Sequence, residues 1–302
     1  MHFARTEEQD QLAATIRSLL AKRSDSEAVR AASVSTTGYD EGLWKALVEQ
    51  IGVAALPIPE AYDGVGASLV ETAVVLEELG ANLAPAPLLA STLAAVRTLL
   101  HGTDEEKADL LPRLAAGEVV PFTLGGIVLE PSEGGAAMDQ TMRLATAPSP
   151  ADPPADVRDV SIALVSALQV GAMQRALDMT VSYSRERVQF GRPIGSFQAL
   201  KHRMADMLVR LEASRSASWG ATAAAAAYLA DPSPESAATL HRLAAVAGSY
   251  CADSLDLVAS EMVQLHGGIA ITWEHDAHLV FKRAHALSAL NGPAHRLRSV
   301  LL

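Results

Sequence analysis

The sequence predicts a mainly α-helical protein with one short non-helical section near its middle. The 302 residues are rich in Ala and Leu, and only 4% are aromatic, a composition that favours helices over sheets. Apolar residues recur at helical spacing before residue 119 and again after residue 158. The section between them holds closely spaced Gly and Pro residues, which are typical of loops and turns.

Charge, cysteine content and the N-terminal stretch narrow the class of protein. The formal net charge is −11 and there is no basic block, so nucleic acid is not expected as a partner. Cys251 is the single cysteine, which fits a reducing compartment. The start MHFARTEEQDQ lacks the apolar core of a signal peptide. The sequence also lacks an uncharged run of about 18 apolar residues, so no membrane-spanning helix is predicted. These features predict a cytoplasmic protein.

The first part of the chain, residues 1–118, is expected to form a helical domain. Ser68 and Glu71 make a capping-box pattern ahead of a helix that Gly80 is expected to end. Thr103 is expected to cap another helix, whose first turn is acidic. The expected helices cover residues 6–21, about 41–51, 68–79, about 86–100 and about 104–116, with an irregular polar stretch over 22–40.

The two remaining sections are expected to differ sharply. Residues 119–158 read as a short β remnant or linker, with one or two strands between Val119 and Leu129. Residues 159–302 read as a four-helix bundle, because long amphipathic helices are joined by short turns. The bundle helices are expected over about 159–186, 196 to about 230, about 233–265, and after Trp273.

The connection between the first two bundle helices, residues 183–207, organises the rest of the chain. Gly191, Pro193 and Gly195 must break the helix there, and Ser196 is a plausible N-cap for the next one. The turn places guanidinium, amide and aromatic groups beside a helix N-terminus, which suits a phosphate-bearing ligand with a ring system. These groups belong to Arg185, Arg187, Gln189, Phe190, Arg192 and Gln198.

Two segments carry a resemblance to a known family. Residues 187–207, RVQFGRPIGSFQALKHRMADM, resemble a motif of the acyl-CoA dehydrogenase superfamily, FAD enzymes that desaturate acyl-CoA thioesters. Residues 262–283, MVQLHGGIAITWEHDAHLVFKR, are similar to the family's second motif, and residues 59–66 to a loop of its N-terminal domain. Either motif alone is compatible with a structural helix turn with solvated arginines, but the pair in this order is specific.

The resemblance implies the family's N-terminal helical domain and its C-terminal four-helix bundle. Members normally insert a β-barrel-like domain between the two, and that domain contacts the flavin ring and forms part of the acyl-CoA wall. Residues 119–158 are too short to close a barrel. This chain is therefore expected to lack one side of a complete site.

The resemblance also implies where a catalytic base should be. In the family a carboxylate removes the proton α to the thioester while hydride passes to the flavin. Asn291 occupies one expected position, downstream of Arg283, and the other, around residues 226–228, also lacks a carboxylate, so no catalytic residue is expected here. His275 and His278 have no evident third ligand, so no metal site is expected. Weaker candidates for a base are Asp206, Glu212, Glu261 and Glu274.

The cofactor half of the motifs is intact. In the family FAD lies across a dimer interface, and the neighbouring subunit contributes these motifs to it. Guanidinium neutralises a pyrophosphate, and glycine allows close backbone approach. Pro293 replaces a Thr that is usual in the family, which argues against a flavin ring held by this chain alone. The resemblance implies five FAD-binding residues: Arg187, Phe190, Gln198, Gln264 and Gly268.

We therefore expect a degenerate subunit of a heteromeric acyl-CoA dehydrogenase, with one FAD per heterodimer in an α2β2 assembly. A full-length acyl-CoA dehydrogenase subunit would be the partner and supply the base. The resemblance implies an acyl-CoA substrate, with a steroid-CoA thioester suggested by analogy, and an electron-transferring flavoprotein as acceptor. Two alternatives stay open: a scaffold that binds no flavin, and a self-sufficient homo-oligomeric flavoprotein.

Overall fold

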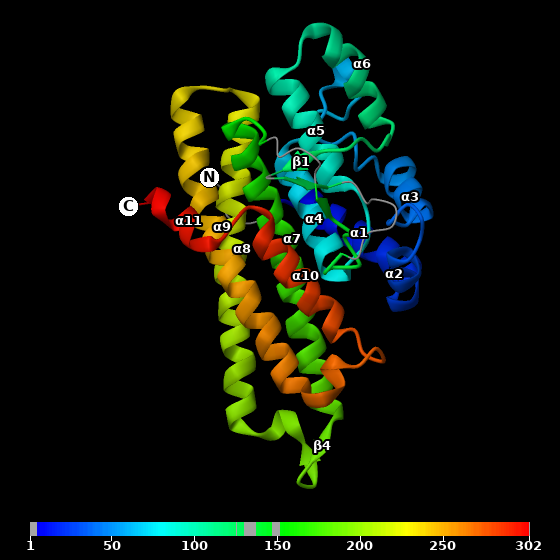
Figure 1. The fold of residues 1–302 in the computed structure, drawn as a ribbon, viewed down its shortest axis with the longest axis vertical. Coiled ribbons are helices and arrows are strands. Elements are labelled where there is room, and N and C mark those ends of the chain that lie inside the picture. The colour runs from blue at the N-terminus through cyan, green and yellow to red at the C-terminus, as the bar shows by residue number, and fades with distance from the viewer. Residues whose placement is uncertain (1–4, 125, 130–136, 147–151, 302) are drawn as a thin grey trace.

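The computed structural model describes residues 5–124, 126–129, 137–146 and 152–301 and is mainly helical, which confirms the predicted fold class. Long helices form a bundle along the molecule, and shorter N-terminal helices pack beside its upper half (Figure 1). One hydrophobic core cluster runs through both parts. The N-terminal helices and the bundle therefore support each other through shared apolar contacts.

The N-terminal helices begin at well-formed caps. The side chains of Thr6, Ser68 and Thr103 each accept a hydrogen bond from a backbone amide in the first turn of their helix. The side chain three residues further on (Gln9, Glu71 or Glu106) accepts one from the backbone amide of the cap residue. Each helix therefore begins with a complete capping box. The elements are α1 (Glu7–Arg23), α2 (Ser26–Ser33), α3 (Glu41–Ile51), the 3₁₀ helix η1 (Glu60–Tyr62), α4 (Leu69–Asn82), α5 (Leu88–His101) and α6 (Asp104–Ala115).

Helix α2 corrects the prediction that residues 22–40 are irregular. Asp25 caps the helix by accepting a hydrogen bond from the amide of Ala28, and Val29 and Ala32 are buried. The helix has only 8 residues. Two buried side chains on so short a helix give too few repeats for a helical period to stand out in the sequence.

The bundle is built around α7, which packs against α4, α8 and α9. By length and composition α7 could cross a membrane, but 89% of its most apolar window is buried inside the protein, so it is a core helix. Ser233 caps α9, and Pro234 follows as its first helical residue, a position that favours proline. The elements are α7 (Ala155–Glu186), α8 (Gln198–Ala230), α9 (Pro234–His266), α10 (Ala277–Leu290), α11 (Ala294–Arg298) and the 3₁₀ helix η4 (Ser299–Leu301).

Two glycines let α4 and α7 approach closely. A Cβ atom on Gly171 would lie 2.0 Å from the carbonyl oxygen of Glu77, and one on Gly80 would lie 2.4 Å from the carbonyl oxygen of Leu168. The prediction that Gly80 ends its helix is therefore wrong. Helix α4 continues past Gly80, and Leu83 takes the left-handed conformation at its C-cap.

The described part of the middle section contains a small antiparallel sheet. Its strands are β1 (Thr123–Leu124), β2 (Ile127–Val128) and β3 (Ala145–Thr146), in that order across the sheet. The first two strands lie where one or two strands were predicted, and β3 adds a third from later in the chain. The expected linker over 130–136 and 147–151 lies outside the described residues.

Candidate functional site

The connection between α7 and α8 projects from one end of the bundle as a hairpin (Figure 1). Strands β4 (Val188–Gln189) and β5 (Arg192–Pro193) pair antiparallel, with Phe190 and Gly191 as the two turn residues. Both turn residues have positive φ, 53° and 76°, as a two-residue hairpin of this type requires. A bulky residue is strained in that conformation, and Phe190 is 92% exposed. A strained, exposed ring at a hairpin tip makes Phe190 a candidate for contact with a ligand.

Helix α8 begins without a side-chain cap, which corrects the predicted N-cap. Ser196 ends the 3₁₀ helix η2 (Ile194–Ser196), and its hydroxyl donates to the carbonyl of Pro193 at 2.7 Å instead. Phe197 takes the cap position, and Gln198 is the first helical residue. Amide groups at an uncapped helix start favour a negatively charged ligand.

The two arginines of the hairpin region differ in their contacts: Arg192 packs on an aromatic ring, and Arg187, within the described part of the chain, does not. The Arg192 guanidinium carbon lies 4.0 Å from the centroid of the Phe197 ring, and the Phe190 ring meets the same ring edge-on at 6.1 Å. Arg187, at the C-cap of α7, is exposed and forms no ion pair with any described residue. Its guanidinium is therefore available to an anion.

The second motif forms the connection between α9 and α10. Gln264 is exposed in the last turn of α9, and the 3₁₀ helix η3 (Gly267–Ile271) follows. Gly267 has a φ of 67°, outside the usual range of other residues. A Cβ atom on Gly268 would meet no atom within 4 Å. Packing does not require a glycine at that position, and the open space permits close approach of a ligand to the backbone.

One ring contact joins the two motifs. The ring of Tyr183, in the last turn of α7, stacks on the buried His266 ring at the end of α9, with 4.5 Å between centroids. His266 Nδ1 donates to the carbonyl of Met262 at 2.8 Å. Burial lowers the pKa of His266 and of the neighbouring His275, which favours neutral imidazoles near neutral pH. Neither Tyr183 nor His266 was predicted as a site residue. Tyr183 lies just before the first motif and His266 lies within the second, and this placement is the signal available in the sequence.

The five residues predicted to bind a cofactor therefore lie on two connections that are linked at one end of the bundle. All five are exposed. They combine a free guanidinium, an exposed aromatic ring, amide side chains and open backbone, which fits an anionic ligand with a ring system. Because all five groups are exposed, a second surface is needed to enclose such a ligand. The five are Arg187, Phe190, Gln198, Gln264 and Gly268.

The expected base position holds a neutral hydrogen-bonded pair. Asn291 is half-buried at the C-terminal end of α10, and its Oδ1 accepts a hydrogen bond from Ser161 Oγ at 3.1 Å. None of the four weaker carboxylate candidates is buried. Glu261 pairs with Arg203, Glu212 pairs with Arg215, and Asp206 and Glu274 are exposed. None of the four has the dry surroundings that a base for an α-proton needs.

No metal centre emerges from the described residues, since no three His, Cys, Asp or Glu side chains there could hold an ion together. His275 precedes α10 and His278 lies in its first turn, so the two do not share a helix face, and both make local hydrogen bonds. His275 Nδ1 accepts from the amide of Ala277 at 3.2 Å, and His278 Nδ1 donates to the carbonyl of His275 at 2.7 Å.

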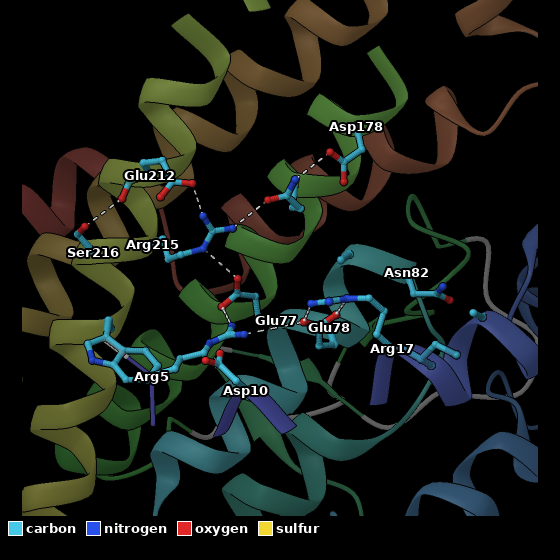
Figure 2. A pocket seen from close by; sticks show the side chains of 15 residues that line it. Arg5, Asp10, Arg17, Glu77, Glu78, Asn82, Asp178, Glu212, Arg215 and Ser216 are labelled. Atoms are coloured by element: carbon cyan, nitrogen blue, oxygen red, sulfur yellow. Dashed lines mark hydrogen bonds and ion pairs between the residues drawn. The ribbon is translucent and has the colours of Figure 1, made fainter. Parts of the chain in front are cut away.

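A cavity of about 810 Å³ lies away from both motifs, between α1, α4, α7 and α8 (Figure 2). Glu77 lies between two guanidinium groups, accepting from Arg5 at 2.7 Å and from Arg215 at 3.1 Å. Arg17 donates to Glu78 at 2.6 Å. The arginines that line the cavity are therefore already paired with carboxylates, and none of the five predicted cofactor residues lines the cavity. The cluster fastens the N-terminal helices to the bundle.

Comparison with known domain families gives two matches. The acyl-CoA dehydrogenase N-terminal domain matches residues 6–118, and the acyl-CoA dehydrogenase C-terminal domain matches residues 161–302. The helical N-terminal part, the bundle and the paired motifs define an oxidoreductase of acyl-CoA thioesters. The chain belongs to the acyl-CoA dehydrogenase family.

Two curated relatives match over nearly their whole length. Acyl-CoA dehydrogenase IpdE2 of Mycolicibacterium smegmatis is 42% identical over 311 residues, which covers 95% of this chain and 96% of the relative. IpdE2 of Mycobacterium tuberculosis is 43% identical, covering 94% and 93%. Because each alignment spans both chains almost end to end, neither relative has room for an additional barrel-sized domain.

Solved structures share the fold. The ChsE4–ChsE5 complex from Mycobacterium tuberculosis contains a chain that matches with a TM-score of 0.81 and 24% identity, covering 100% of this chain and 98% of that one. A variant of the Tcur3481–Tcur3483 steroid acyl-CoA dehydrogenase matches with a TM-score of 0.80 and 26% identity, covering 98% and 96%. Both structures are named as pairs of different chains.

Proposed function

We propose that this chain is one subunit of a heteromeric, cytoplasmic, FAD-dependent acyl-CoA dehydrogenase that introduces an α,β double bond into an acyl-CoA thioester. A full-length acyl-CoA dehydrogenase subunit is the partner. It supplies the β-domain, the catalytic base and most of the substrate cleft. This chain completes the FAD site, so each heterodimer holds one FAD and two heterodimers form an α2β2 assembly.

One observation carries this proposal. All five predicted cofactor residues are exposed at one end of the bundle, while Asn291 stands at the expected position of the base. Cofactor-binding groups that are exposed on one chain can enclose a ligand when a second chain covers them. A neutral amide hydrogen-bonded to Ser161 cannot remove a proton from carbon.

The proposed roles follow from the chemistry of each residue. The exposed guanidinium of Arg187 can neutralise a pyrophosphate, and the exposed ring of Phe190 can lie against a planar group. Gln198 and Gln264 offer amide groups, and Gly268 leaves its backbone accessible. FAD, when bound, would accept the hydride from the β-carbon. Family membership supports FAD as the cofactor.

The substrate and acceptor are proposed on narrower grounds. A chain of a steroid acyl-CoA dehydrogenase shares 26% identity and nearly complete coverage with this chain. That likeness supports a bulky polycyclic CoA thioester as the substrate. The family resemblance supports an electron-transferring flavoprotein as the electron acceptor.

Flavin stoichiometry tests the proposal. The chain is purified alone and with a co-expressed full-length partner, and bound FAD is quantified by absorbance after release. We expect no stable FAD in the lone chain, one FAD per pair in the complex, and a large loss on Arg187→Ala. Arg97→Ala, an exposed arginine on α5, is the matched control.

Two outcomes would overturn the proposal in different ways. Unchanged FAD content in the Arg187→Ala complex would favour a scaffold that binds no flavin. One FAD per chain in the lone protein, with desaturase activity, would establish a self-sufficient flavoprotein.

A further inference from the structure

Arg283, at the end of the second motif, is a charged side chain enclosed by the protein, with 1% of its surface exposed. Its partners come from the middle section of the chain. Arg283 Nε lies 2.5 Å from Asp139 Oδ2, and its Nη2 donates to Thr141 Oγ1 at 2.6 Å. The amide and hydroxyl of Thr141 donate to the other carboxylate oxygen of Asp139, at 2.8 and 2.6 Å. The three residues form a closed, buried network.

The same segment also reaches the N-terminal helices. Arg143 donates through Nη1 to the carbonyl of Ser35, and its amide donates to the carbonyl of Asp139 at 3.0 Å. Residues 137–146 therefore bridge the bundle and the N-terminal part, with Asp139 buried at the centre of the bridge.

Little space remains beneath this bridge. A cavity of about 40 Å³ is bordered by Leu79 and Leu89 of the N-terminal part, by Met142 of the bridge, and by Leu168 and Arg283 of the bundle. That volume is on the order of one water molecule. Pockets for small organic ligands are typically about 300–1,000 Å³. An acyl group does not fit in this cavity while residues 137–146 are in place.

A buried guanidinium needs a carboxylate or comparable anion, because leaving it unpaired in an apolar setting is costly. Here the chain itself supplies that anion from a short local turn. The geometry requires a carboxylate at Arg283 but does not require that it be covalently attached. The two nitrogens of Arg283 and the hydroxyl of Thr141 would present the same donors to a free carboxylate.

We propose that Arg283 is the centre of a carboxylate-binding site that the chain occupies with its own Asp139, and that residues 137–146 thereby close the space beside Arg283 to an acyl-CoA thioester. The carboxylate site stands on the geometry alone. The consequence for acyl-CoA rests on the proposed function: each heterodimer then binds a single acyl-CoA, in the partner.

Chemical rescue tests the carboxylate site in the full-length chain within its complex. Asp139→Gly removes the internal carboxylate and leaves room for a small one. We expect the midpoint of thermal unfolding to fall by roughly 5–10 °C. Sodium formate should restore part of that loss in the variant and leave the wild-type midpoint unchanged, whereas sodium chloride at equal ionic strength should restore none.

Two further variants separate the inference from general destabilisation. Asp253 pairs with Arg298 on the surface, so Asp253→Gly removes a carboxylate from an exposed ion pair and should show no formate-specific recovery. Asp139→Gly combined with Arg283→Met removes the anion site and should also lose the formate effect. No formate response in Asp139→Gly, or an equal response in either of these variants, would overturn the carboxylate site.

Closure is tested by equilibrium dialysis of the complex with octanoyl-CoA, with FAD quantified in the same samples. At most one equivalent of octanoyl-CoA per pair is expected for the wild type, and two equivalents would overturn closure. An FAD content other than one per pair would refute the proposed function while leaving the formate result standing. One FAD per pair without formate rescue would refute this inference alone.

Discussion

Tyr183 and His266 stack with 4.5 Å between their ring centroids and an angle of 22° between their planes. Tyr183 lies four residues before Arg187, and His266 lies two residues after Gln264. The stack therefore couples the end of α7 to the end of α9 within about one helical turn of predicted cofactor residues on each side. The stack is one of the contacts that hold the two connections together, beside the ion pair of Arg203 with Glu261.

Replacing Tyr183 with Leu should loosen this coupling. Ring pairs of this kind contribute about 0.5–1.5 kcal/mol beyond buried area, so we expect a loss of that order in the free energy of unfolding. We also expect faster FAD release from the complex, measured by fluorescence of the freed flavin. Tyr250→Leu, on the partly exposed face of α9, is the control. Equal FAD release from both variants would show that the stack does not position the site.

One buried histidine, His266, and two half-buried ones, His275 and His278, predict a specific pH dependence of stability. Burial lowers the pKa of His266, His275 and His278 in the folded chain, so the unfolded chain binds protons first as the pH falls. Stability is fully present above the unfolded value of 6.5 and declines as the pH drops from there toward the folded values. Each group contributes at most about 1.4 kcal/mol per pH unit in that window.

The measurement is the thermal midpoint between about pH 7 and pH 5. His266→Gln should flatten the decline, because Gln does not titrate. His295→Gln, at an exposed position, should leave the slope unchanged. A slope that His266→Gln does not alter would exclude His266 as one of its sources.

Two Gly→Ala substitutions should have opposite effects on stability, one where α4 packs closely on α7 and one at an open position in α8. A methyl group on Gly171 would collide with the Glu77 carbonyl, so Gly171→Ala should destabilise the chain by about 3 kcal/mol or more. Gly220 lies inside α8, and a methyl group there would meet no atom within 4 Å, so Gly220→Ala should stabilise by about 0.5–1 kcal/mol. Urea unfolding of both variants checks the pair, and equal effects would contradict the packing.

Asn291 should be dispensable for turnover. Asn291→Ala removes the hydrogen bond from Ser161 and should cost about 1 kcal/mol of stability while leaving kcat of the complex unchanged. Asn291→Glu should not create desaturase activity in the lone chain, because a base without the other half of the site has no bound substrate. A tenfold fall in kcat for Asn291→Ala would assign this residue a part in catalysis.

The elements that could be read from the sequence are those set by near neighbours. The capping box joins Ser68 and Glu71, which are three positions apart, and the break at Gly191 and Pro193 spans a single turn. Gly80 was misread because its reason lies across the fold, at the Leu168 carbonyl. A glycine that ends a helix and a glycine that admits a second helix look the same in one sequence.

The site shows the same division. Motif patterns located Arg187 and Phe190, but not the left-handed strain at Phe190 or its exposure. The pairing of Asp139 with Arg283 joins residues 144 positions apart. A lone aspartate in a Gly-rich segment carries no local signal of such a partner, so three-dimensional packing alone reveals it.

The Phe190 ring leaves a large apolar group on the exposed surface of this chain. Ile271 and Trp273, on the connection between α9 and α10, are exposed as well, at 78% and 64%. Apolar groups of this size in water promote self-association and recognition by chaperones and proteases. Under the proposed heteromeric assembly, a cell that made this chain in excess of its partner would commit folding capacity to the surplus. Balanced synthesis of the two chains would then avoid that burden, so the proposed assembly carries a requirement on gene dosage as well as on structure.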